Sequence, residues 1–151
     1  MRIPEGIGDM LSLRVKFRVP NDLAEATFDT AAGINFLKSR GVRSIGLIGH
    51  SFGGAVVIRA AANDPAVRTV VTLSTQSYGV DPVVRLKNGT PILLIHGKED
   101  KVLPPSSSVY TYGLAHEPKK LVLYEGAGHS LDEVADEVYE EVKNWILANL
   151  K

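Results

Sequence analysis

Apolar and polar residues follow one another along this chain in short blocks, and the spacing of the apolar residues changes from block to block. Several apolar runs are short enough for buried strands. They cover residues 44–49, 67–74, 91–97 and 120–126. Helical spacing or helix-boundary residues mark the blocks between and around them: residues 22–40, 52–63, 104–115 and the segment from residue 130 onward. This alternation predicts an α/β fold, with an open, mostly parallel sheet flanked by helices.

The first and last predicted helices carry recognisable N-terminal signals. Asp22 with Glu25, and Ser130 with Glu133, have the spacing of a capping box. Gly41 supplies the stop for the first helix. The last helix should turn one apolar stripe to the core. That stripe comprises Val134, Val138, Val142, Trp145 or Ile146, and Leu150.

Residues 11–19 alternate strictly between apolar and polar side chains. Leu11, Leu13, Val15, Phe17 and Val19 would face one way, and the serine and three cations between them the other. A period of two predicts a strand with one face in solvent, which suits the edge of a sheet. We therefore expect residues 1–20 to form an atypical N-terminal segment that contains an edge strand with solvated charges.

Length and composition narrow the class of protein. With 151 residues, 44% hydrophobic and 23% charged, the chain is predicted to form a single globular domain over residues 1–151. The formal net charge is zero, so no nucleic-acid or membrane partner is expected. The chain lacks cysteine, which excludes disulfides, thiolate metal sites and a cysteine nucleophile. The N-terminal residues show no apolar signal region, so a cytoplasmic protein is expected.

The segment Gly49-His50-Ser51-Phe52-Gly53 matches the pattern G-x-S-x-G. It lies between a predicted strand and a predicted helix, where a nucleophile elbow requires it. Small flanking residues let strand and helix approach, and the sharp turn projects the serine hydroxyl. The pattern therefore predicts Ser51 as a nucleophile, with the backbone N–H of Phe52 as an oxyanion donor.

A serine nucleophile needs a base, and the base needs an acid to orient it. Asp100 follows the predicted strand 91–97, and His129 follows the strand 120–126. The carboxyl ends of parallel strands meet in one crevice, so these side chains should converge on Ser51. Glu99 competes with Asp100 for the role of the acid.

The other histidines have plainer interpretations. His50, inside the elbow, should pack or hydrogen-bond locally, His96 should be structural, and His116 should lie in a surface turn. None of them shows the spacing of a metal site. We therefore expect no metal and no cofactor.

The segments "GHSFGG", "HGKED" and "GAGH" together resemble the nucleophile, acid and histidine segments of the α/β-hydrolase superfamily. The resemblance covers residues 22–151 and is greatest to its compact, dienelactone-hydrolase-like esterases. It implies a serine esterase that forms an acyl-enzyme on Ser51. His129 would act as general base and then acid, and Asp100 would orient His129.

The chain departs from that family before Ser51. It has only one convincing strand there and no His-Gly segment to give the second oxyanion donor. That donor could come from Gly6 or Gly8, or from a second subunit, since an uncovered sheet edge favours a homodimer or a higher homo-oligomer. Residues 75–90 are too few for a helical lid, so this would be a shortened α/β-hydrolase fold without a lid. An open site predicts small, soluble, short-acyl esters.

Two alternatives to ester hydrolysis remain. The same triad could hydrolyse lactones or thioesters, or transfer acyl groups, because all of these reactions share the acyl-enzyme. The chain could instead be a non-catalytic hydrolase remnant that serves as a binding module.

Overall fold

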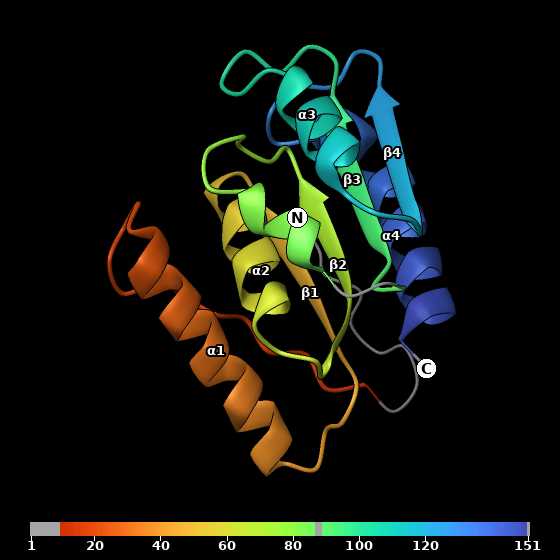
Figure 1. The fold of residues 1–151 in the computed structure, drawn as a ribbon. Helices are drawn as coiled ribbons and strands as arrows, with labels where there is room; N and C mark the ends of the chain where they lie inside the picture. The colour runs from red at the N-terminus through yellow and green to blue at the C-terminus, as the bar shows by residue number, and fades with distance from the viewer. Residues whose placement is uncertain (1–9, 87–88, 151) are drawn as a thin grey trace.

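A computed structural model describes residues 10–86 and 89–150. Its strands form one parallel sheet in the order β1-β2-β3-β4 (Figure 1). The strands are β1 (Ile45–His50), β2 (Val67–Leu73), β3 (Ile92–Gly97) and β4 (Lys119–Tyr124). The predicted open parallel sheet is therefore confirmed.

Helices cover both faces of this sheet (Figure 1). They are α1 (Leu23–Ser39), α2 (Phe52–Ala62), α3 (Ser106–Leu114) and α4 (Ala135–Asn149), with short 3-10 helices η1 (Asp81–Arg85) and η2 (Asp132–Val134). The segments that connect consecutive strands pack on one face, together with α1, while α4 packs on the other. Right-handed crossovers that always step in one direction keep to one face, which explains this division.

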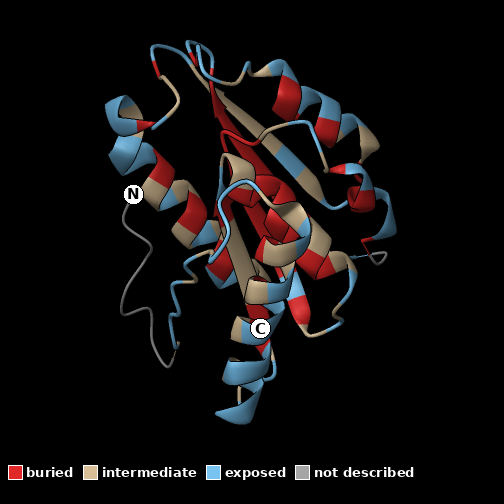
Figure 2. Ribbon diagram, turned by 90° about the vertical axis from the view of Figure 1, so that its left-hand side faces the viewer, coloured by how far each residue is buried: buried red, intermediate tan, exposed pale blue. Residues whose placement is uncertain are grey.

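The central strands β2 and β3 form the buried centre of the molecule, whereas β4 has no fully buried residue (Figure 2). Every residue of β3 is buried, as expected of a central parallel strand. In α4 the predicted stripe is confirmed, with Val138, Val142 and Ile146 buried against the sheet. None of the helices within residues 10–86 and 89–150 is long and apolar enough to cross a bilayer.

The N-terminus of α1 matches the sequence, but only one half of the predicted capping box forms. The Asp22 carboxylate accepts a hydrogen bond from the backbone N–H of Glu25 at 3.0 Å, as an N-cap should. The Glu25 carboxylate does not reach back, because it pairs with Arg18 at 2.5 Å.

The capping box predicted at Ser130 is wrong. The Ser130 hydroxyl donates to Asp132 at 2.9 Å, and Leu131 has a φ of 61°, so the chain cannot enter an α-helix there. Helix α4 begins at Ala135, after η2. The Glu133 carboxylate instead accepts from the backbone N–H of Gly128 at 2.6 Å, which ties down the loop before His129.

The edge strand predicted over residues 11–19 is also wrong: no strand is found in the described part of the N-terminal segment, residues 10–20. Leu11 is 62% exposed and Leu13 is 40% exposed. Leu13 and Val15 lie against Gly33 of α1 rather than on a sheet. An alternating pattern shows which side chains a strand could bury, but a strand also needs a neighbour within hydrogen-bonding distance.

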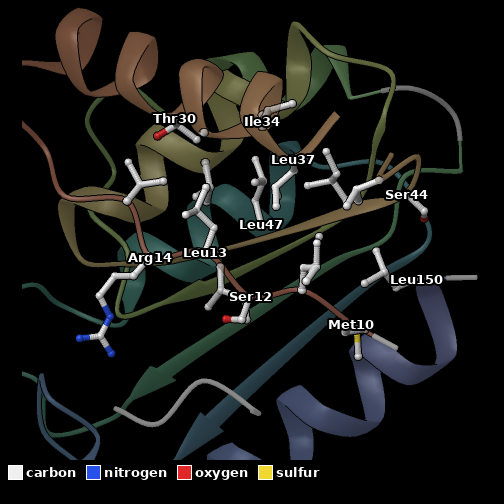
Figure 3. Close-up of a pocket in the computed structure, with 18 of the residues that line it drawn as sticks. Met10, Ser12, Leu13, Arg14, Thr30, Ile34, Leu37, Ser44, Leu47 and Leu150 are labelled. Carbon is white, nitrogen blue, oxygen red and sulfur yellow. The ribbon is translucent and has the colours of Figure 1, made fainter. Parts of the chain in front are cut away.

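A groove of about 850 Å³ lies between this segment and β1 (Figure 3). Apolar side chains from both sides line it, including Leu13, Ile34, Leu37, Leu47 and Leu150. Ser51, Asp100 and His129 are not among its lining residues. The groove therefore follows the outer edge of β1 and reaches the elbow at Gly49, His50 and Gly53, although no side chain of Ser51, Asp100 or His129 lines it.

Candidate active site

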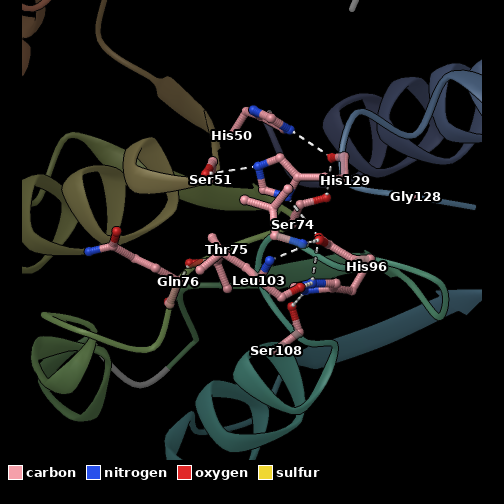
Figure 4. Close-up of polar contacts among 12 residues, drawn as sticks. His50, Ser51, Ser74, Thr75, Gln76, His96, Leu103, Ser108, Gly128 and His129 are labelled. Atoms are coloured by element: carbon pink, nitrogen blue, oxygen red, sulfur yellow. Dashed lines mark hydrogen bonds and ion pairs between the residues drawn. The ribbon is translucent and has the colours of Figure 1, made fainter. Parts of the chain in front are cut away.

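The loops at the carboxyl ends of the strands bring Ser51 and His129 together (Figure 4). Ser51 directly follows β1, Asp100 follows β3, and His129 follows β4. All strands of the sheet are parallel, so their carboxyl ends lie on the same side of the molecule. The structure places the three predicted side chains at one site.

Ser51 occupies a strained turn between β1 and α2. Its φ of 58° and ψ of −119° lie outside the conformations that a serine readily adopts. A Cβ on Gly49 would come within 2.1 Å of the Gly53 carbonyl oxygen, and one on Gly54 within 2.3 Å of the Thr75 hydroxyl. Glycine at positions 49 and 54 is therefore required for this turn.

A continuous chain of hydrogen bonds links the three side chains. His129 Nε2 lies 3.1 Å from Ser51 Oγ, and His129 Nδ1 lies 2.7 Å from Asp100 Oδ2. The carboxylate can only accept, so Nδ1 carries the proton and Nε2 is free to accept the serine proton. This arrangement can activate Ser51 as a nucleophile.

Asp100 is held as an anion. Its Oδ1 accepts the backbone N–H groups of Val102 and Leu103, both at 2.9 Å. Burial by itself would raise the pKa of Asp100, but the hydrogen bonds from His129, Leu103 and Val102 outweigh it and lower that pKa below its ordinary value. Of the two candidate acids, Asp100 makes the hydrogen bond to His129, whereas Glu99 is exposed.

The backbone carbonyl of His129 is also fixed. The Ser74 hydroxyl donates to it at 2.8 Å, and His50 Nε2 lies 3.0 Å from it (Figure 4). Ser74 was absent from the sequence prediction. It directly follows β2, so the strand-end rule that indicated Asp100 and His129 could have found it.

One oxyanion donor has a defined place. Phe52 is the first residue of α2, so its N–H has no acceptor within the helix and is free for a developing oxyanion beside Ser51. Gly6 and Gly8, candidates for the second donor, lie outside the described residues.

The remaining histidines have other environments. His50 contacts the His129 loop, and its ring centroid lies 4.9 Å from that of His129. His96 is fully buried beneath the acid loop, and exposed His116 lies 3.1 Å from the Val84 carbonyl. Within residues 10–86 and 89–150 no His, Asp and Glu side chains are grouped to hold a metal ion.

Gly97 controls how closely the acid and histidine loops approach. A Cβ there would come within 2.2 Å of the Ala127 carbonyl oxygen. We expect Gly97→Ala to lower the free energy of unfolding by about 1–3 kcal/mol, because two backbones would have to separate. Chemical denaturation measures this change.

Gly113→Ala is the matched control, because a Cβ at this exposed helical position would meet nothing within 4 Å apart from its chain neighbours and the backbone of its own helix. It should leave stability unchanged or raise it by up to about 1 kcal/mol. Equal stability of Gly97→Ala and wild type would show that the two loops are not packed as described.

Comparison with known sequences gives a family. The model of the dienelactone hydrolase family matches residues 10–145. Two curated relatives, the uncharacterized proteins YfhR of Escherichia coli O157:H7 and of Escherichia coli strain K12, are 32% and 31% identical. Each alignment covers 81% of this chain and 53% of the relative, so the chain spans about half the length of these relatives.

Solved structures share the fold at lower identity. The dienelactone hydrolase from Anabaena variabilis ATCC 29413 is 22% identical with a TM-score of 0.77, over 86% of this chain and 62% of that one. The esterase domain of a Rhodothermus marinus protein is 22% identical with a TM-score of 0.74, over 83% and 69%. Est1E from Butyrivibrio proteoclasticus is 21% identical with a TM-score of 0.75, over 85% and 70%.

Proposed function

Because the chain belongs to the dienelactone hydrolase family and has a shortened α/β-hydrolase fold, we propose that it is a serine hydrolase that cleaves small carboxylic esters. The observation that carries this proposal is the hydrogen-bond chain from Ser51 through His129 to Asp100. A serine hydroxyl, a neutral imidazole nitrogen and a buried carboxylate in this order are the parts that acyl transfer requires.

In the proposed mechanism Ser51 Oγ attacks the ester carbonyl while His129 Nε2 takes the hydroxyl proton. The C–O bond to the alcohol then breaks, and His129 returns that proton to the departing alkoxide. Water attacks the resulting acyl-Ser51 in the same way, releasing the acid and regenerating the serine. Asp100 keeps the His129 ring oriented and stabilises the imidazolium that forms in each half-reaction.

The oxyanion of each tetrahedral intermediate would accept the N–H of Phe52. Removing one donor from such a hole costs on the order of 10²–10³ in rate. A single donor from this chain would therefore give a slow enzyme, and a second polypeptide segment could raise the rate by supplying another.

Lactone hydrolysis is the second candidate, favoured by the match to the dienelactone hydrolase family. A lactone is a cyclic ester, so the same attack by Ser51 opens the ring and leaves the hydroxyl attached to the acyl group. Hydrolysis of a small lactone beside an open-chain ester of equal carbon number separates the two candidates.

The test uses a 4-nitrophenyl ester and a fluorophosphonate probe on the wild-type protein. We expect ester turnover, and a covalent adduct that peptide mapping assigns to Ser51. A protein that neither hydrolyses the ester nor reacts with the probe would overturn the proposal and favour the non-catalytic binding module. An adduct on another serine would refute the assignment of the nucleophile.

The acyl chain length offers a further prediction. In the described part of residues 75–90 only η1 is helical, and the groove along β1 is lined by neither Ser51 nor His129. Although the groove reaches the elbow at Gly49, His50 and Gly53, the Ser51 side chain does not line it, so a long acyl chain on Ser51 would gain little of the usual ~0.8 kcal/mol per buried CH₂. We expect kcat/KM not to rise from butyryl to dodecanoyl esters. A steady rise with chain length would contradict this.

Within residues 10–86 and 89–150 β1 pairs only with β2, and its other edge supports a proposed homodimer. The N–H groups of Ile45 and Ser51 bond toward β2, at 3.0 and 2.8 Å, so the amides of Gly46 and Ile48 face the other edge. Unpaired edge amides favour pairing with another chain, and a formal net charge of zero does not oppose self-association. Sedimentation equilibrium at micromolar concentration should give twice the chain mass. A monomer would refute the dimer.

A further inference from the structure

A second group of side chains, which includes His96 and Ser108, lies beneath Ser51 and His129 (Figure 4). His96, in β3, is fully buried. Its Nδ1 lies 2.6 Å from the hydroxyl of Ser108, in α3, and its Nε2 lies 2.9 Å from the Leu103 carbonyl oxygen. The same Nε2 is 3.1 Å from Asp100 Oδ2.

This arrangement fixes the proton on His96. Nε2 faces a carbonyl oxygen and a carboxylate oxygen, both of which can only accept, so Nε2 must carry hydrogen. The N–H donates to Leu103, and its positive end lies against Asp100. Nδ1 faces Ser108, whose hydroxyl can donate to it.

His96 and Ser108 do not form a competing catalytic pair. Both are fully buried, so neither can touch an ester bound at the strand ends. His129, in contrast, is 21% exposed at its side chain. What His96 can reach is the acid loop: Leu103 donates its N–H to Asp100 and accepts the hydrogen of His96 through its carbonyl.

We propose that His96 is a positioning residue, which acts through the acid loop to hold Asp100 Oδ2 on His129 Nδ1. This inference rests on the proposed function of Ser51, Asp100 and His129. The backbone N–H groups of Val102 and Leu103 fix one carboxylate oxygen. His96 fixes the loop from below through the Leu103 carbonyl, and the positive end of its Nε2–H lies 3.1 Å from the other oxygen, which favours the carboxylate orientation that faces His129.

Two variants test this role. His96→Leu fills the space but has no donor, whereas the amide nitrogen of His96→Gln can take the place of Nε2–H. We expect His96→Leu to lower kcat for a 4-nitrophenyl ester about 10- to 100-fold with little change in KM, and His96→Gln to recover a large part of kcat. His116→Leu, which changes an exposed histidine, is the matched control and should behave as wild type.

Nitrogen NMR of the imidazole rings gives a readout that does not depend on activity. At neutral pH we expect His96 to carry hydrogen on Nε2, and the His129 Nδ1–H resonance to shift in His96→Leu. Wild-type kcat in a folded His96→Leu would overturn the positioning role, as would a His96 without hydrogen on Nε2. If His96→Leu does not fold, His96→Gln alone decides the question, because its amide nitrogen restores a donor. A kcat of His96→Gln about 10- to 100-fold below wild type would then overturn the role of the Nε2–H donor.

The two proposals fail in different ways. A wild-type protein that neither turns over the ester nor reacts with the fluorophosphonate probe would overturn the proposed function, and the positioning role with it. An active wild type with an equally active His96→Leu would overturn only the positioning role.

Discussion

Ser51→Ala is expected to lower kcat for small esters by about 10⁴–10⁶-fold. The hydroxyl oxygen of Ser51 would form the covalent bond to the acyl group, and an alanine methyl cannot replace it. The variant should also lose its reaction with the fluorophosphonate probe. Steady-state kinetics and mass spectrometry of the treated protein measure the two losses.

The fold should survive this substitution. The Ser51 hydroxyl contacts His129, and the strained backbone of the elbow is held by the Ser51 N–H on the Leu73 carbonyl at 2.8 Å, which alanine retains. The free energy of unfolding should therefore change by no more than about 0.5 kcal/mol.

Ser130→Ala serves as the control for Ser51→Ala. Ser130 is adjacent to His129 in the chain, but its exposed hydroxyl donates to Asp132. The control should keep activity within about twofold of wild type, since exposed substitutions have small effects. Substantial ester turnover by Ser51→Ala would remove Ser51 from the mechanism.

The parts of the fold that follow from local pattern were predicted from the sequence. The apolar runs at 67–74 and 91–97 are short, rich in β-branched or leucine side chains and bounded by turn residues, and both form buried strands. The convergence of Ser51, Asp100 and His129 followed from one rule, that parallel strands end at a common edge. Only the order of strands and helices was needed for it.

The wrong predictions concern segments whose structure depends on contacts with residues outside the local pattern. The alternation at 11–19 is real, but no strand lies close enough to pair with that segment within the described residues. Ser130 and Glu133 have capping-box spacing, yet Glu133 bonds Gly128 across the loop instead. Sequence spacing indicates which local contacts a side chain can make. It does not indicate which of them is replaced by a contact that forms when the chain packs.

The residues that support the site, His96, Ser108 and Ser74, were not recognised as such in the sequence for the same reason. His96 is one apolar-flanked histidine of a buried strand, and nothing in its spacing indicates that Ser108 and Asp100 meet it from different elements. Ser74 was accessible to the strand-end rule but has no motif of its own. Residues that support a site through others are visible only once the strands are packed.

Asp100→Asn should lower kcat about 10³- to 10⁴-fold, in line with the loss that follows when a triad aspartate becomes asparagine. The backbone N–H groups of Val102 and Leu103 require an acceptor at the Oδ1 position, so the amide oxygen must stay there. The NH₂ group then faces His129 Nδ1 and donates to it. His129 must carry its hydrogen on Nε2, where it can no longer accept the proton of Ser51.

The same substitution should change how stability depends on pH. Because the pKa of Asp100 is lowered in the folded protein, its contribution is complete above the unfolded pKa of about 3.9 and is lost as the pH falls through the folded value. Unfolding free energies measured from neutral pH into acid should therefore fall less steeply for Asp100→Asn than for wild type.

Glu99→Gln, which changes the exposed neighbouring carboxylate, should retain both the activity and the acid dependence of wild type. If Glu99→Gln lost activity and Asp100→Asn did not, the acid of the site would be Glu99, and the hydrogen bond between Asp100 and His129 would have no part in catalysis.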